Sequence, residues 1–535
     1  METEVNGELV QVRDKEGIED VIIAANKTKV LQADNTPLRE EPLQSLLGEQ
    51  GDFKKWEKIL KGLIPLPEEG IEEGTRLWYE YVTNPSAEPL DINWTAEEYF
   101  EGWKKMKEDT VSSPGWHFSH LKCIDPKSDT GEVISKLNLL PLKTGYVPKE
   151  WRTGIDSMIP KKTHDLRPEK LRLILLLDCR FNHNNKLIGK IMMEYGERMG
   201  LLAKEQYGSR KNKSAVQHAL NKRLVLDTIR HTKAPAVYCA NDAKSCYDRI
   251  LFMVAYLAMR KHGITENAAT CAIAGLIEVQ HHIRTVFGDS EKYYGGEKWK
   301  NEDKVIPHGN GQGNGNGPAL WAVISSPLLL ILRESGYGIQ FISPICNEKL
   351  ILAAFGFVDD MDYVQTARDE DESIDVLRKT QEGMTLWESL LRTTGGAIET
   401  SLTKTDWVNI HFVWRNGQWK YKEKDENEKI TVRNHTGETV EVIQMDVKEA
   451  RETLGVMQTP NGSEKAQITK LTKKIDAWSR NVLPSGLKNA DARDLYDDDD
   501  DDDVDDVDDD DDLDIPLAPM KADDVELVAL GRQWD

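Results

Sequence analysis

The alternation of apolar and polar positions divides the chain into a helical first part and a mixed second part. Residues 1–90 show helical periodicity that is interrupted by Pro65 and Pro67, and no set of catalytic residues can be recognised among them. From Trp151 onward, short apolar runs alternate with helical patterns, which is typical of an α/β or α+β domain. We therefore expect a mainly helical N-terminal extension followed by a domain of mixed helices and strands.

A helix with a distinct start follows this extension. Thr95 precedes the helical pattern and Glu98 lies three positions later, which is the spacing of a capping box. A Ser-Pro-Gly sequence then breaks the pattern, and His117, His120 and Cys123 recur at three-residue intervals. Three such side chains on one helical face can bind zinc, but a fourth ligand is missing. The pattern favours a role in capping or packing over a zinc site.

Several later segments have the pattern of individual strands and helices. The expected elements are a strand at 237–239, a helix after 247, an apolar helix at 319–332, a strand, turn and strand at 351–364, β structure at 419–445, and a basic amphipathic helix at 466–478. Two acidic turns at strand ends thus lie more than a hundred residues apart in this reading.

Composition excludes several classes of protein. Hydrophobic residues make up 39% and charged residues 30% of the 535 positions, so collagen, disulfide scaffolds and wholly disordered chains do not fit. The longest nearly apolar stretch, Pro318 to Leu332, is shorter than a bilayer span. The first residues lack a secretory signal, so we expect an intracellular protein of the nucleus or cytoplasm whose six cysteines are free thiols.

The net charge of −23 is unevenly distributed. Fifteen of the 92 acidic residues lie between Asp497 and Asp514, and without them 77 acidic residues face 69 basic ones, a net charge of −8. The run predicts a solvated acidic tail, although it could instead fold back on a basic groove as a nucleic-acid mimic. In contrast, residues 143–260 hold 23 Lys or Arg and 11 Asp or Glu, a net charge of +12. Such a region suits a nucleic-acid partner, but a solvated helical surface has a similar composition.

The first segment with chemical interest is Val-Tyr-Cys-Ala-Asn-Asp, which ends at Asp242. An apolar strand that ends in Asp, with Tyr247 five positions later, can supply a metal-binding carboxylate and a flat side chain at the floor of a pocket. Taken alone, an Asp at this place is more often a turn former or a helix cap.

The second segment is Phe-Gly-Phe-Val-Asp-Asp, which ends with Asp359 and Asp360. Two adjacent carboxylates between apolar residues repel each other, and their burial is costly unless a cation neutralises them. Hard oxygen ligands without a neighbouring His or Cys suit Mg²⁺. The alternative is an exposed Asp-Asp turn, for which the apolar flanks are unusual.

Two further segments could contact a ligand. His-Gly-Asn-Gly-Gln-Gly, which ends with Gln312 and Gly313, leads through more glycines into an apolar helix, so its backbone can approach a ligand closely. A flexible linker is the alternative. Lys161 and Arg172 lie beside apolar strand patterns, where basic side chains can reach a triphosphate.

The order of these segments resembles that of reverse transcriptases, most closely those of non-LTR retrotransposons. Lys161 and Arg172 come first, then Glu-Gln-Tyr-Gly at 205–208, the Asp242 segment, the Gln312 segment and finally Asp359 with Asp360. The resemblance covers about residues 94–485. It implies an α+β fold of the right-hand polymerase type, in which a palm with an antiparallel sheet and helices is joined to fingers and a partial helical thumb.

The resemblance also implies site residues for an RNA-directed DNA polymerase. The metal ligands and catalytic carboxylates would be Asp242, Asp359 and Asp360 with the carbonyl of Ala243, and they would hold two Mg²⁺ ions, for which Mn²⁺ could substitute. The nucleotide-binding residues would be Lys161, Arg172, Tyr247, Gln312 and Gly313. Tyr247 would lie beneath the sugar and exclude the 2′-hydroxyl of an NTP, which disfavours an RNA-dependent RNA polymerase. For Lys404, a proton donor and ordinary packing are both open.

The chain departs from the family in its C-terminal part, where only the start of a thumb is recognisable. The expected regions are a helical extension at 1–92, a helical lead-in at 93–142, fingers and palm at 143–462, a partial thumb at 463–490, and a disordered acidic tail at 491–535. The expected partners are an RNA template, a DNA or RNA primer and dNTPs. The alternative function is a catalytically idle retroelement remnant that binds nucleic acid or protein.

Overall fold

A five-stranded sheet brings together strands from residues 236–444. The computed structural model describes residues 1–482, apart from residues 6–7, 84–87, 105, 108–109, 162–164, 297–306, 369–372 and 402–403, so the predicted acidic tail lies outside the described residues. The strands of the sheet, in spatial order, are β10 (Ala354–Phe357), β11 (Asp360–Thr366), β5 (Ala236–Asp242), β12 (Asp406–Ile410) and β17 (Ile443–Gln444). Neighbouring strands are antiparallel except for β12 and β17.

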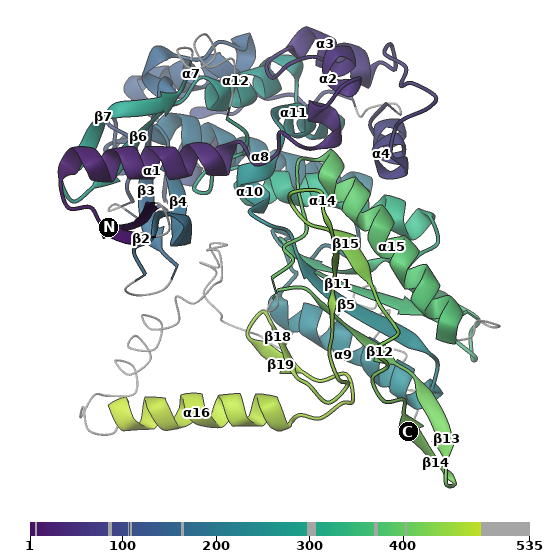
Figure 1. Cartoon of the computed structure of the whole chain (residues 1–535). Helices are drawn as coiled ribbons and strands as arrows, with labels where there is room; N and C mark the ends of the chain where they lie inside the picture. Colours follow the sequence, from purple (N-terminus) through teal and green to yellow (C-terminus); the bar gives the residue numbers. More distant parts are fainter. Residues whose placement is uncertain are drawn as a thin grey trace.

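Two hydrophobic cores lie on opposite faces of this sheet (Figure 1). Helix α9 (Ala215–Thr232) covers one face, and α15 (Ser373–Thr393) with α14 (Gly317–Glu334) covers the other. Strand β5 is buried along its whole length, and its alternate residues enter the two cores. This explains why the strand reads as a continuous apolar run that ends only at Asn241 and Asp242.

A second sheet has four strands, which come from residues 153–295. In spatial order these are β4 (Leu171–Leu176), β3 (Thr153–Pro160), β6 (Gln280–Thr285) and β7 (Gly288–Gly295). Strands β3 and β4 pair antiparallel, and Ile159 lies opposite Arg172. Helix α1 (Lys15–Val30) packs against β6 and β7.

The helices of the N-terminal segment share the main core with helices from much later in the chain. Trp56 is completely buried, and its ring packs against Tyr256 at a centroid distance of 5.5 Å. Glu57 accepts hydrogen bonds from Tyr256 at 2.8 Å and from Arg260 at 2.6 Å. The segment is therefore an integral part of the packed structure.

The remaining helices are mostly short. They are η1 (Pro37–Arg39), α2 (Leu43–Leu47), α3 (Phe53–Leu60), α4 (Glu73–Thr83), α5 (Ala96–Lys104), α6 (Phe118–Lys122), α7 (Asp129–Thr144), η2 (Lys149–Arg152), η3 (Pro168–Lys170), α8 (Cys179–Met199), α10 (Cys246–Arg249), α11 (Phe252–Lys261), α12 (Glu266–Ile277) and α16 (Lys465–Val482). The predicted capping box is confirmed at the start of α5, where Thr95 N donates to Glu98 at 2.8 Å and Glu98 N donates to Thr95 at 3.2 Å.

Five two-stranded ribbons complete the described structure. They are β1 (Glu2–Val5) with β2 (Glu8–Gln11), β8 (Ile339–Ile342) with β9 (Lys349–Leu352), β13 (Phe412–Arg415) with β14 (Gln418–Tyr421), β15 (Thr431–Arg433) with β16 (Thr439–Glu441), and β18 (Arg451–Thr453) with β19 (Val456–Gln458). The described residues thus combine helices with mainly antiparallel sheets, which is consistent with the α+β class.

Helix α14 is a core helix. Among the described residues it alone is long and apolar enough to cross a membrane, but 78% of its apolar window is buried inside the protein. It lies between α8 and α15, where its residues contribute to the main core.

Candidate active site

The sheet brings the predicted carboxylates together. Strands β5 and β11 are neighbours in antiparallel register, and Asp242 lies directly opposite Asp360. Asp359 occupies the turn before β11, and its carbonyl accepts a hydrogen bond from Ala243 N at 3.1 Å. Residues that are more than a hundred positions apart in the sequence therefore meet where the ends of two neighbouring strands lie side by side.

The turn that carries Asp359 has an unusual backbone conformation. We call β10, the turn Val358–Asp359 and β11 the carboxylate hairpin. Val358 has φ +52°, although a β-branched side chain strongly disfavours positive φ. Such a conformation persists only where the surroundings hold it, and it is frequent at functional sites.

The side chains of Gln206 and Trp321 hold this turn through hydrogen bonds. Val358 N donates a hydrogen bond to Gln206 Oε1 at 3.1 Å. The carbonyl of Val358 accepts hydrogen bonds from Gln206 Nε2 at 3.4 Å and from the indole of Trp321. Both polar backbone groups of the strained residue are thus satisfied by side chains.

The Glu-Gln-Tyr-Gly segment runs along the edge of β10 and leaves no space for a larger residue at Gly208. A Cβ atom at Gly208 would lie 2.5 Å from Val358 N. Glu205 is buried, and both of its carboxylate oxygens lie 2.9 Å from Arg333 Nη1. The motif order includes this segment without a predicted role, and its contacts make it a support for the carboxylate hairpin.

The carboxylates lie in an environment that disfavours their charged form. Burial raises the pKa of Asp360 to about 6, and the neighbouring Asp242 adds to this effect. Burial also raises the pKa of Asp242, an effect that Lys404 opposes. Lys404 Nζ lies 3.0 Å from Asp242 Oδ2, and although burial lowers the pKa of Lys404, the pairing raises it overall. The lysine is thus the cation that partly neutralises this site.

The donor set fits a hard divalent cation. Asp242 and Asp360 supply carboxylate oxygens from adjacent strands, and Mg²⁺ prefers such ligands. Ala243 forms an isolated β-bridge with Ile398 that does not use the Ala243 carbonyl. The hydrogen bonds of this bridge run from Glu399 N to the Asp242 carbonyl and from Lys244 N to the Ala397 carbonyl. The described residues contain no group of three His, Cys, Asp or Glu side chains that could hold a metal ion. A cation here would therefore also need a backbone, ligand or solvent oxygen.

The glycine-rich loop packs against the helix that carries Tyr247. Asn310 N donates to the Tyr247 carbonyl at 2.8 Å. Gly309 has φ +101°, and a Cβ atom there would lie 2.8 Å from the Cα of Asp248. The close approach of the two backbones requires glycine at this position, so the segment is not a free linker.

The same loop then joins the four-stranded sheet. The Gln312 carbonyl accepts a hydrogen bond from Leu175 N at 2.7 Å, and Gln312 forms a parallel bridge with Ile174. A Cβ atom on Gly313, which has φ +103°, would lie 2.7 Å from the Leu175 carbonyl. Gln312 and Gly313 thus lie beside Leu175, which is three residues after Arg172 on β4.

Lys161 also lies within electrostatic reach of the carboxylates. It follows β3, and its backbone N donates to the Lys170 carbonyl at 3.1 Å. Its charge lowers the pKa of both Asp242 and Asp248, against the larger effect of burial. The structure therefore places one predicted triphosphate-binding residue near the predicted metal ligands.

The predicted capping role of His117 and His120 is confirmed. His117 is the N-cap of α6, and its backbone N donates to the His120 ring at 3.2 Å. A separation of 5.4 Å between the two ring centroids and an interplanar angle of 82° fit this local role.

A buried polar network that the sequence analysis missed lies beside the site. Lys222 Nζ forms an ion pair with Asp362 at 2.6 Å, and both side chains are almost completely buried. Tyr238 donates to the other oxygen of Asp362 at 2.6 Å, and Lys222 also donates to Thr453 at 2.9 Å. The only signal in the sequence is an Asp inside an apolar strand, because its partner lies 140 positions away.

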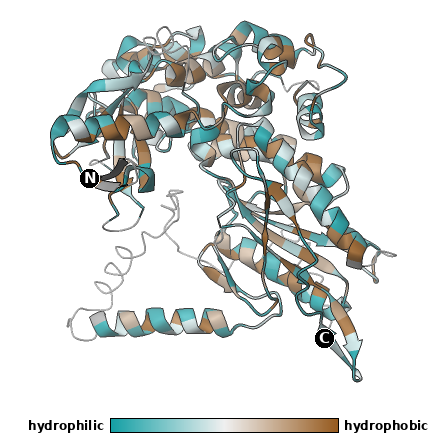
Figure 2. Ribbon diagram, viewed as in Figure 1, coloured by the Kyte–Doolittle hydropathy of each residue, from teal (hydrophilic) through white to brown (hydrophobic). Residues whose placement is uncertain are grey.

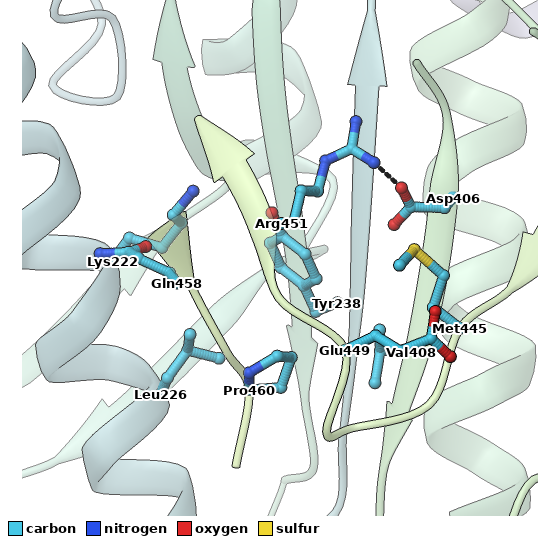
Figure 3. A pocket seen from close by; sticks show the side chains of 10 residues that line it. All are labelled: Lys222, Leu226, Tyr238, Asp406, Val408, Met445, Glu449, Arg451, Gln458 and Pro460. Atoms are coloured by element: carbon cyan, nitrogen blue, oxygen red, sulfur yellow. Dashed lines mark ion pairs between the residues drawn. The ribbon is translucent and has the colours of Figure 1, made fainter. Parts of the chain in front are cut away.

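A small pocket next to this network lies where several elements pack against one another (Figure 3). Its walls come from α9, β5, β12 and the segment that carries β18 and β19, and it has room for a water molecule at most. In the figure, Arg451 reaches across toward Asp406, with which it forms an ion pair. The contacts between the residues that line the pocket hold the β18–β19 ribbon against the sheet.

No protein-family model matches the chain, and no curated protein matches its sequence.

Proposed function

We propose that the chain is an RNA-directed DNA polymerase of retroelement type. The observation that carries the proposal is the register of β5 and β11, which pairs Asp242 with Asp360 and puts Asp359 in the adjoining turn. In this proposal the five-stranded sheet is the palm, the four-stranded sheet belongs to the fingers, and α16 is a partial thumb.

The residues around the carboxylates support a nucleotide as the substrate. Asp242 and Asp360, with Asp359 from the adjoining turn and with oxygens of the substrate or solvent, would hold Mg²⁺, which would activate the primer 3′-hydroxyl and neutralise phosphate charge. Lys161 and Arg172 would bind the triphosphate from the neighbouring sheet, where Lys acts as a point charge and Arg as a fork. Tyr247, with the glycine-rich loop behind it, would restrict the space beneath the sugar and favour a dNTP.

Primer extension on an RNA template with Mg²⁺ tests this proposal. Wild-type chain should extend a DNA primer with dNTPs but not with NTPs, and Asp359→Ala should slow extension by a factor of about 100 or more. Asp446→Ala, which removes a half-buried turn carboxylate that accepts from Lys448 N at 2.8 Å, is the matched control and should retain activity. Tyr247→Val should allow NTP incorporation.

An idle remnant that binds nucleic acid is the second candidate. It is favoured by the ion pair between Lys404 and Asp242, because the lysine already neutralises a carboxylate that a catalytic cation would need. Binding of primer and template without any extension, in wild type and Lys404→Ala alike, would establish the remnant and refute the polymerase.

A further inference from the structure

Helix α16 is attached to the rest of the described structure mainly by its first turns. Gln467 accepts a hydrogen bond from Met457 N at 2.7 Å, and Lys470 donates to the Gly455 carbonyl at 2.9 Å and pairs with Glu452. From Leu471 to Arg480 almost every residue is exposed. In Figure 1 the helix projects away from the β18–β19 ribbon, beyond the outline of the sheet.

One side of α16 is an exposed apolar stripe. The stripe consists of Ile468, Leu471, Ile475 and Trp478, which are 59%, 48%, 60% and 38% exposed. Spacings of three and four residues place them in one row along the helix. Figure 2 shows α16 as a mostly hydrophilic helix that is interrupted by hydrophobic bands. A continuous row of large apolar side chains is typical of a binding surface.

Helix α16 is also basic. The helix carries Lys465, Lys470, Lys473, Lys474 and Arg480 against a single Asp476, a net charge of +4. Lys474 lies three positions after Leu471 and four before Trp478, so its stem runs beside the stripe. A binding partner that covers the apolar row therefore also meets positive charge.

The segment that follows α16 has the complementary chemistry. The run from Asp497 to Asp514 contains Val504, Val507 and Leu513 among its fifteen aspartates, and Ile515 and Leu517 come directly after it. It thus combines aliphatic side chains with a high density of negative charge. Residues 483–496 join it to the helix, and fourteen residues reach at most about 50 Å, nearly twice the length of about 27 Å of an eighteen-residue helix.

We propose that residues 497–517 dock on α16 of the same chain. The aliphatic side chains cover the apolar stripe, and the net positive charge of the helix, with Lys474 beside the stripe, attracts the aspartates. Attachment to the helix keeps the effective concentration of the segment in the millimolar range, which favours it over a separate molecule. The proposal does not depend on the proposed function, because it requires only the stripe, the charges and the linkage.

Hydrogen exchange in the full chain tests the docking without nucleic acid. We expect Val504→Ser/Val507→Ser/Leu513→Ser, which keeps every aspartate, to speed exchange of the backbone amides of residues 471–480 about tenfold or more. Ile468→Gln/Leu471→Gln/Ile475→Gln should have the same effect, because Gln retains helix propensity but does not offer the apolar surface of the stripe. The matched control, Thr469→Gln/Ala477→Gln, lies off the stripe and should leave exchange unchanged.

Three results would overturn the proposal. Exchange that is identical in the wild type and the tail variant means that the tail does not cover the helix. Protection that rises with protein concentration and ignores the tail substitutions assigns the stripe to a second copy of the chain. Protection that appears only after addition of an RNA–DNA duplex assigns it to nucleic acid.

Discussion

The carboxylate hairpin and α16 differ in how the rest of the molecule holds them. Several parts of the molecule hold the hairpin. Gln206 and Trp321 bind the turn, β5 pairs with β11, and Lys222 forms an ion pair with Asp362, two residues after Asp360. Helix α16 is joined at one end, and its apolar stripe remains exposed in the described structure.

This difference corresponds to what each region has to do. Carboxylates that converge on one cation need fixed positions, and a strained turn provides them only when its surroundings over-determine it. A surface that takes up a partner can be presented by a single attached helix. We therefore expect substitutions around the hairpin to affect global stability strongly and substitutions on the stripe to affect it little.

The largest loss of stability is expected for Gly208→Ala. The new Cβ atom would lie 2.5 Å from Val358 N and 2.7 Å from Val358 Cγ2, so the hairpin must move away from its support. We expect a loss of about 3 kcal/mol in the free energy of unfolding, measured by denaturant titration. Gly356→Ala, on β10 of the same hairpin, is the control, because its Cβ atom would make only ordinary contacts from 3.5 Å outward. Equal stability of the two variants would contradict the role of Gly208.

Gln206→Met should lower the free energy of unfolding by less than Gly208→Ala does. Methionine has a similar shape but leaves the N–H groups of Val358 and Gly208 without their acceptor, and burying such groups costs about 1–3 kcal/mol. We expect a loss of about 2 kcal/mol by the same titration. Gln418→Met on the exposed ribbon β13–β14 should change stability by less than about 0.5 kcal/mol. A loss at Gln206 no larger than this control would show that the turn holds without the glutamine.

The sequence predicts the local elements of this region but not its supports. The apolar run of β5, the turn at Asp359 and the helix after the glycine-rich loop each follow from patterns within a few residues. The contact between Gln206 and Val358 spans 152 positions, and His308 in the glycine-rich loop bonds to Asp34 across 274 positions. Such contacts depend on how the elements pack, which a single sequence does not encode in any local spacing.

The neighbouring carboxylates of Asp242 and Asp360 give a smaller effect on stability, with the opposite sign. Without divalent cations, Asp360→Asn should stabilise the chain by about 1 kcal/mol, because it removes repulsion between neighbouring charges. Mg²⁺ at ten times its dissociation constant should stabilise the wild type by about 1.4 kcal/mol and the variant by less. Thermal unfolding with and without Mg²⁺ measures both effects. Asp446→Asn is the control, and an equal response of all three proteins to Mg²⁺ would argue against a cation at this site.

The smallest effect on global stability is expected on α16. Ile468→Gln/Ile475→Gln replaces side chains that are already more than half exposed, so the free energy of unfolding should change by less than about 0.5 kcal/mol. Ile59→Gln, the same substitution at a completely buried position of α3, should cost about 3 kcal/mol or more, because an amide without partners enters the core. Denaturant titration of both variants tests whether α16 unfolds separately from the core. A loss of 2 kcal/mol or more in the α16 variant would mean that the helix packs against the body of the protein in solution, and the contrast with the carboxylate hairpin would then disappear.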